Sequence, residues 1–241
     1  MDNRPIGVFD SGLGGLCAVK QLRNLLPKES IVYLGDTGRV PYGSKSKETI
    51  IKYAMQDINF LLKHNVKMII AACGTVSSNI TSEIIESLPV PYTGVLLPLA
   101  KKSTAITKNN RIGVIATLAS IKSGGFQKAI KNINPSEEVI GVPCPLFVHL
   151  VENGLIEKGN QITELTAKMY LEPLKIENPD TLILGCTHYP LIYDAISKVM
   201  GKDVILIDPG KETATYVKEY LENNDKLGEN QNPSIKYFVT D

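Results

Sequence analysis

The chain has 241 residues, of which 43% are hydrophobic and 21% are charged, a composition typical of a soluble globular protein with one large or two modest domains. Its 26 basic and 25 acidic residues leave a net charge of +1, so neither nucleic-acid binding nor binding to a membrane surface is expected. No apolar run approaches the roughly 20 residues that span a bilayer, and we expect a cytoplasmic protein without a membrane partner.

In the first half of the chain, short apolar runs predict strands at 6–10, 31–36 and 66–73, each followed by a helical pattern. The helix after the second strand has the clearest periodicity. Its apolar side is expected to comprise Ile50, Ala54, Ile58, Leu61 and Leu62. Its outward-facing side is expected to comprise Lys52, Gln56, Asp57 and Lys63.

The second half continues this alternation of strands and helices. The predicted strands are 111–117, 138–142, 181–185, 203–208 and 234–240, and the predicted helices lie near 160–174, 190–200 and 212–221. Such alternation indicates an α/β protein with mainly parallel sheets.

Two motifs recur at similar distances along the chain. Ile6-Gly7-Val8 recurs at Ile112, 106 residues later, and a Cys-x-Thr motif at Cys73 recurs at Cys186, 113 residues later. These offsets predict two α/β domains of like topology. We place the first domain at residues 1–97 plus 206–241 and the second at 98–205.

Four chemically active side chains come at or directly after the carboxyl ends of predicted strands: Asp10, Asp36, Cys73 and Cys186. Ligands of parallel α/β folds bind beyond these strand ends. Both cysteines also precede a helical segment, whose N-terminus favours the thiolate needed for proton removal. His188, two residues after Cys186, is a candidate to order a thiol and carry protons.

Other interpretations of these residues remain open. The two cysteines suit buried structural thiols, although the repeated Cys-x-Thr motif argues against this. The glycines of 11–15 lack a phosphate-binding signature and suit a carboxylate better. Asp10 and Asp36 lack the D-x-D pattern that metal-dependent phosphate chemistry would favour, and no Cys/His cluster has metal-ligand spacing.

Five blocks, in order, resemble the glutamate racemases of the cofactor-independent Asp/Glu racemase superfamily. They are Asp10–Gly15, Gly35–Gly43, Ala72–Thr75, Cys144–Phe147 and Gly185–Pro190, and the resemblance extends from Ile6 to Asp241. It implies two similar domains related by a pseudo-twofold axis, with glutamate bound in the cleft between them and no cofactor. The family interconverts L- and D-glutamate, the D-isomer feeds peptidoglycan synthesis, and a homodimer is expected.

The resemblance also assigns roles to individual residues. It makes Cys73 and Cys186 the two catalytic thiols, on opposite faces of the substrate α-carbon, assisted by Asp10, His188 and Glu152. It implies that the following residues bind substrate: Asp10, Ser11, Asp36, Pro41, Tyr42, Gly43, Ser44, Cys73, Gly74, Thr75, Thr117, Ser120, Cys186, Thr187 and His188.

The sequence departs from the family pattern in three places. Gly74 replaces an asparagine whose amide is expected to contact substrate, which leaves substrate preference open. Ser120 replaces a threonine and keeps the hydroxyl. Family members commonly continue into a further helix beyond the position of Asp241.

Three rival functions remain. A racemase of the same superfamily acting on aspartate or another amino acid would use the same two thiols. A cysteine hydrolase would need only one of the cysteines together with His188 and would form an acyl-thiol intermediate. A binding protein for acidic amino acids would leave glutamate unchanged.

Overall fold

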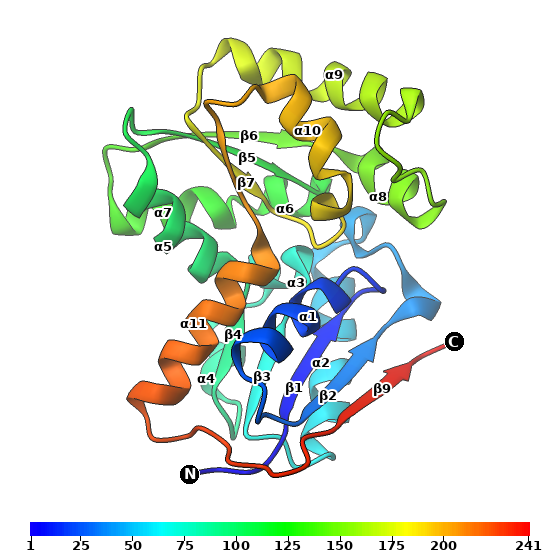
Figure 1. Cartoon of the computed structure of the whole chain (residues 1–241), viewed down its shortest axis with the longest axis vertical. Helices are drawn as coiled ribbons and strands as arrows, with labels where there is room; N and C mark the ends of the chain where they lie inside the picture. Colours follow the sequence, from blue (N-terminus) through cyan, green and yellow to red (C-terminus); the bar gives the residue numbers. More distant parts are fainter.

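The computed structural model describes residues 1–241 as two lobes, each built around its own parallel sheet (Figure 1). Sheet A has the strand order β4 (Tyr92–Gly94), β3 (Met68–Ala71), β1 (Ile6–Asp10), β2 (Ile31–Gly35) and β9 (Ile235–Val239). Sheet B has the order β6 (Glu138–Pro143), β5 (Arg111–Ala116), β7 (Thr181–Leu184) and β8 (Ile205–Ile207). All pairings in both sheets are parallel, which confirms the predicted fold class.

The two sheets share one topology. When sheet B is traced from β8 to β6, its order β8-β7-β5-β6 repeats the order β4-β3-β1-β2 of sheet A, with β9 added at one edge. In each lobe the first strand is central and the third strand precedes a cysteine of the repeated motif. The sequence repeat therefore corresponds to a repeat of structure.

Helices cover both faces of each sheet. In the first lobe they are α1 (Leu16–Leu25), α2 (Lys47–Leu62), α3 (Gly74–Asn79), α4 (Ser82–Glu86) and α11 (Pro209–Asn223). In the second lobe they are α5 (Leu96–Ile106), α6 (Leu118–Ser123), α7 (Gly125–Ile133), α8 (Pro145–Glu152), α9 (Gln161–Ile176) and α10 (Tyr193–Met200). Three 3₁₀ turns complete the chain: η1 (Thr37–Arg39), η2 (Tyr42–Ser44) and η3 (Tyr189–Ile192). No helix is both long enough and apolar enough to span a bilayer.

Alternation of side chains along β1 supplies two separate cores in the first lobe. Ile6 and Val8 pack with α1 and α11 on one face of sheet A, whereas Phe9 packs with α2 on the other face. Sheet B is likewise enclosed by two cores, one with α8, α9 and α10 and the other with α5 and α7. Strands buried on both faces explain why the predicted strands read as continuous apolar runs.

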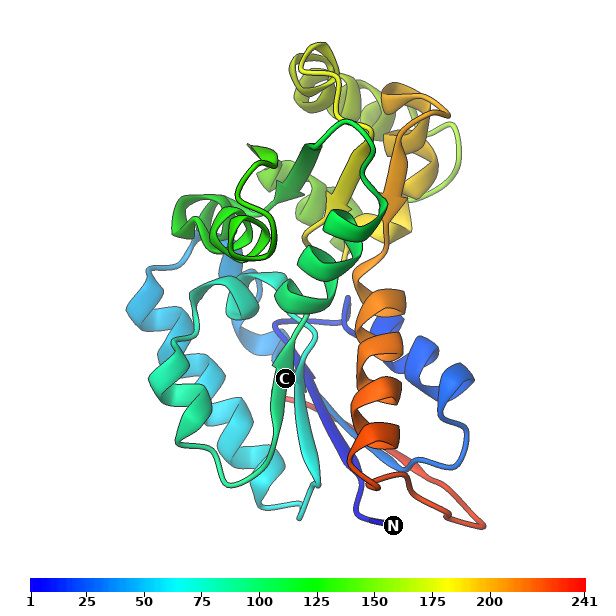
Figure 2. The ribbon, with the colours of Figure 1, turned by 90° about the vertical axis from the view of Figure 1, so that its left-hand side faces the viewer.

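The chain passes from the first lobe to the second before β5 and returns after β8, where α11 packs against α1 (Figure 2). The predicted return at residue 206 is too early, because β8 (Ile205–Ile207) pairs with β7 in sheet B. Asp208 then caps α11 by accepting hydrogen bonds from the amides of Gly210 and Lys211. We propose that the division into residues 1–97 plus 206–241 and 98–205 otherwise describes the two folding units.

Three sequence expectations differ from the observed elements. The helix predicted after Cys73 is two short helices, α3 and α4, because the backbone is extended at Ile80 and Thr81. Strand β4 and helices α5 to α8 lie in stretches for which the sequence analysis predicted no element. Asp57, predicted to face solvent, is only 2% exposed. It lies three residues after Ala54 and four before Leu61, on the buried side of α2.

Candidate active site

The two repeated cysteines meet where the lobes join. Cys73 follows β3 and caps the N-terminus of α3, and Cys186 comes two residues after the end of β7. A Cβ atom built on Gly74 would lie 2.0 Å from the carbonyl oxygen of Gly185 and 3.7 Å from Cys186 Cα. The residues that adjoin the two thiols are therefore in contact across the junction.

Both thiols are almost enclosed in this structure, with Cys73 4% and Cys186 7% exposed. Burial raises the pKa of Cys73 to about 11, and the nearby charge of Asp10 raises it further. Burial also raises the pKa of Cys186. The expectation that the following helices would lower these pKa values is therefore wrong for this closed arrangement, because desolvation outweighs the backbone hydrogen bonds.

His188 links Cys186 to a carboxylate. Its Nδ1 lies 3.7 Å from Cys186 Sγ, and its Nε2 is hydrogen-bonded to Glu152 at the end of α8. When Nε2–H donates to the carboxylate, the neutral imidazole presents Nδ1 to the thiol as a proton acceptor. Cys186, His188 and Glu152 thus form a chain that can remove and return the thiol proton.

Asp10 lies close enough to both thiols for its charge to raise their pKa values, and it joins the two lobes. It is fully buried, accepts a hydrogen bond from the amide of Gly12 at 3.0 Å, and accepts another from Thr187 Oγ1 of the second lobe at 3.2 Å. Burial raises the pKa of Asp10, which positive charge on His188 opposes. The glycine loop predicted to bind a carboxylate thus holds a carboxylate of the protein itself.

A row of hydroxyl groups crosses the same junction. Thr75 Oγ1 lies 2.9 Å from Thr117 Oγ1, which lies 2.9 Å from Ser120 Oγ, and Ser11 Oγ lies 3.4 Å from Cys73 Sγ. The hydroxyl of Thr117 also caps α6, and all four of these side chains are buried. Short hydroxyl side chains that converge beside two thiols can bind the carboxylates of a small amino acid.

The loop of Pro41 to Ser44 reaches the junction from the first lobe. A Cβ atom on Gly43 would lie 2.6 Å from Thr117 Cβ, so this loop packs directly on the second lobe. Tyr42 points back into the first lobe, where its hydroxyl is bonded to Asp36. The carboxyl group of Asp36 is occupied by partners within its own lobe, and its direct contact with a substrate stays a prediction.

The structure thus brings most of the expected site residues together, and their roles remain predictions. Sequence reasoning missed Asp57, which contacts the hydroxyl of Tyr42 from α2.

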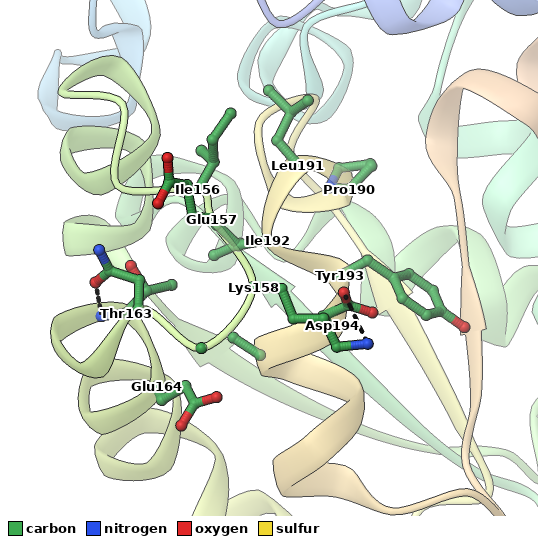
Figure 3. Close-up of a pocket in the computed structure, with 13 residues that line it drawn as sticks. Ile156, Glu157, Lys158, Thr163, Glu164, Pro190, Leu191, Ile192, Tyr193 and Asp194 are labelled. Carbon is green, nitrogen blue, oxygen red and sulfur yellow. Dashed lines mark hydrogen bonds and ion pairs between the residues drawn. The ribbon is translucent and has the colours of Figure 1, made fainter.

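A separate cavity of about 190 Å³ lies between the α8–α9 connection and α10 (Figure 3). It contains the ion pair of Lys158 with Asp194 but no thiol or imidazole, so it does not belong to the cysteine site.

Comparison with known proteins identifies the family. The family model of the Asp/Glu/Hydantoin racemases matches residues 17–217. A glutamate racemase of Geobacter metallireducens is 42% identical over 239 residues, which cover 99% of this chain and 88% of that protein.

Solved structures agree with this result. Glutamate racemase RacE1 of Bacillus anthracis superposes with a TM-score of 0.96 at 36% identity, covering 100% of this chain and 90% of that one. The glutamate racemase of Francisella tularensis, solved with D-glutamate, gives 0.93 at 42% identity, covering 100% and 89%. An aspartate racemase of Picrophilus torridus, at 16% identity and a TM-score of 0.65, shares the fold alone. The chain therefore belongs to the Asp/Glu/Hydantoin racemase family, and within it to the group of the glutamate racemases.

Proposed function

We propose that this protein interconverts L- and D-glutamate by proton transfer at the α-carbon, with Cys73 and Cys186 acting from opposite faces. The observation that carries the proposal is the position of the two thiols. Each follows the third strand of its own sheet, and the residues next to them touch across the junction between the lobes. A carbon placed between two such groups can lose a proton to one face and gain one from the other.

Each thiol has its own route for the proton that it must release before it can act as a base. Cys186 can pass its proton to His188 Nδ1, whose imidazolium form is stabilised by Glu152. Cys73 lies 3.4 Å from Ser11 Oγ, and Asp10 is close enough to affect its pKa. The ammonium group of an amino acid would bring a positive charge to these buried sites and so favour the thiolates.

The negative charge that develops on the substrate needs separate stabilisation. A positioned acid or base contributes about 10²- to 10⁴-fold, which is too little for the weakly acidic α-proton of an amino acid. The hydroxyls of Ser11, Thr75 and Thr117 lie near the thiols and can donate hydrogen bonds to the substrate, as Thr187 donates to Asp10 in this structure. Donors that are already in place stabilise developing charge without the cost of reorganising solvent.

Substrate entry requires movement of the lobes. The sulfur atoms are buried, and Thr75 and Thr117 hydrogen-bond to each other across the junction. A glutamate that binds between the thiols must replace this direct bond with bonds to its own carboxylates. Opening and closing of the two lobes would therefore accompany each turnover.

The test is racemisation of D-glutamate by purified protein without added cofactor, followed by circular dichroism. Conversion to the racemate that is lost in both Cys73→Ser and Cys186→Ser variants supports the proposal. Retention of most activity in either variant would contradict the two-thiol mechanism. Racemisation rates measured on a panel of amino acids that includes aspartate test the alternative substrate. Sequence similarity gives aspartate no support, because the aspartate racemase is only 16% identical to this chain.

We further propose that the D-glutamate formed supplies peptidoglycan synthesis in the cytoplasm and that the enzyme is a homodimer. Both proposals rest on the family to which the chain belongs. To test the first, the gene is deleted, and we expect growth only when D-glutamate is added to the medium. Sedimentation of the purified protein tests the second.

A further inference from the structure

Asp57 of α2 is not hydrogen-bonded to either thiol, yet its carboxyl group contacts the Pro41–Ser44 loop of the candidate active site. It is 2% exposed, and its Oδ2 lies 3.1 Å from the hydroxyl of Tyr42. The same hydroxyl is bonded to Asp36, which is fully buried. One tyrosine hydroxyl therefore lies between two buried carboxyl groups.

The hydrogen atoms available do not satisfy both contacts when both carboxyl groups are ionised. A tyrosine hydroxyl donates one hydrogen bond and can accept others, whereas an ionised carboxylate only accepts. If Tyr42 donates to Asp36, the contact with Asp57 is a hydrogen bond only when Asp57 carries a proton and donates to the tyrosine oxygen. The arrangement of the three groups thus favours a proton on one of the two carboxyl groups.

The surrounding donors indicate that Asp57 holds this proton. Asp36 accepts hydrogen bonds from Tyr42 and, at 2.8 Å, from Thr240 Oγ1, and it forms an ion pair of 2.6 Å with Arg39 Nε, a set of partners that suits a carboxylate. Asp57 has only the contact with the tyrosine hydroxyl and a longer hydrogen bond, of 3.3 Å, that Arg39 donates to its Oδ1. Burial, followed by the charge of Asp36, raises the pKa of Asp57 to about 7.

One cation faces this carboxyl pair. The charged and titratable groups around Asp57 are Arg39 from η1, Asp36 from the end of β2, Tyr42 from η2, and Asp10 from β1, whose charge acts at longer range. Arg39 is further held by Gln56 and stacks on the ring of Tyr53 at 4.2 Å. A single guanidinium balances one carboxylate, so the cluster is neutral only when Asp57 is protonated.

Tyr42 connects this cluster to the proposed site. The next residue in the chain, Gly43, packs so closely on Thr117 that a Cβ atom would lie 2.6 Å from Thr117 Cβ. Thr117 in turn hydrogen-bonds to Thr75 beside Cys73. The hydroxyl of Tyr42 thus anchors the loop to the first lobe, while the next residue, Gly43, packs on the second lobe.

We propose that Asp57 is a positioning residue that holds a proton between itself and Tyr42 and thereby fixes the Tyr42–Ser44 loop where it closes on Thr117 around substrate. The inference rests on the proposed racemase function. Loss of the proton places two carboxylates against one hydroxyl and one guanidinium. The loop then loses an anchor, and substrate binding weakens while the thiols stay in place.

The test compares Asp57→Asn, whose amide donates to Tyr42 at every pH, with Asp57→Ala, which cannot donate. Asp203→Asn, at an exposed aspartate of the second lobe, is the matched control. KM and kcat for D-glutamate are measured from pH 6 to 8.5, together with the Kd of D-glutamate by calorimetry.

For the wild type and the control, we expect KM and Kd to rise severalfold as the pH passes about 7. For Asp57→Asn we expect values that stay low across this range, and for Asp57→Ala values about tenfold higher at every pH, with kcat within threefold of the wild type in all variants. The same pH dependence of KM and Kd in Asp57→Asn as in the wild type would overturn the proposal. So would equal KM values for the asparagine and alanine variants.

A second readout does not depend on activity. In protein labelled with ¹³C at aspartate carboxyl carbons, the resonance that disappears in Asp57→Asn should titrate near pH 7. Titration of this resonance near pH 4 would contradict the inference even in an active racemase. If instead the wild type fails to racemise glutamate, the proposed function fails, and the carboxyl titration and the Kd values still decide the role of Asp57.

Discussion

Gly74 and the carbonyl oxygen of Gly185 meet at the point where the two lobes touch, and a Cβ atom on Gly74 would lie only 2.0 Å from that oxygen. The obstructing atom belongs to the backbone, which cannot turn aside as a flexible side chain can. This contact sets how closely the strand ends that carry Cys73 and Cys186 approach.

The Gly74→Ala variant should therefore hold the lobes apart. Overpacking typically costs about 1–3 kcal/mol, so we expect kcat/KM for glutamate to fall about 5- to 150-fold. The thermal midpoint should change little, because the lobes can separate slightly to relieve the clash. Gly141→Ala is the control, since its Cβ atom would meet only the side chain of Ile121, at 3.2 Å. Unchanged activity of Gly74→Ala would show that closure does not require this contact.

The Glu152→Gln variant tests the proton route from Cys186. The amide keeps the shape of the carboxylate but cannot stabilise a positive charge on His188, so kcat should fall about 10²-fold. Glu157→Gln, an exposed position a few residues later, should retain full activity. Rate measurements in both directions of racemisation check this, and a kcat of Glu152→Gln equal to that of Glu157→Gln would exclude the proposed relay.

Buried Cys73 predicts a loss of stability at alkaline pH. Its pKa is raised in the folded state to about 11, whereas an exposed thiol has a pKa near 8.5. Between these values the unfolded chain releases a proton that the folded chain retains, so the free energy of unfolding falls as the pH rises, by up to about 3 kcal/mol. Urea unfolding from pH 8 to 10.5 should show a smaller fall for Cys73→Ser than for the wild type. Parallel pH profiles would contradict the raised pKa.

The amino-terminal ends of the strands hold a buried ion pair. Lys67 Nζ lies 2.6 Å from Glu29 and also donates to the carbonyl oxygens of Asp2 and Lys226. Removing one partner leaves an unpaired buried charge, so Lys67→Met should lower the free energy of unfolding by about 3–5 kcal/mol.

Lys28→Met provides the comparison, because Lys28 pairs with Glu229 at the surface and should contribute less than about 1 kcal/mol. Urea denaturation at pH 7 measures both effects. A loss in Lys67→Met as small as that in Lys28→Met would mean that Glu29 finds another partner or takes up a proton.

The sequence predicts the sheets well because their strands are buried on both faces. Runs such as Ile6–Asp10 and Thr181–Leu184 are mainly apolar, and each ends at or shortly before a residue of the candidate site, Asp10 in one case and Cys186 in the other. These local features also place Cys73 and Cys186 at equivalent positions.

Long-range contacts are less accessible to the sequence. The burial of Asp57 depends on where the Tyr42 loop folds back, and the meeting of Gly74 with Gly185 depends on how two separate sheets come together. The low exposure of the thiols, and hence their raised pKa values, also follows from the closure of the lobes. For Asp57, its helical spacing from Ala54 and Leu61 indicated the buried side of α2. Its charge nevertheless favoured the prediction that it faces solvent.

The central claim is that two thiols act on opposite faces of one α-carbon, and solvent labelling tests it most directly. D-glutamate is converted in deuterated water, and the α-deuterium content of the L-glutamate formed and of the remaining D-glutamate is measured over the first turnovers. Two separate bases predict deuterium in the product while the remaining substrate keeps its α-hydrogen. Equal labelling of both pools from the start would indicate a single shared base and contradict the account.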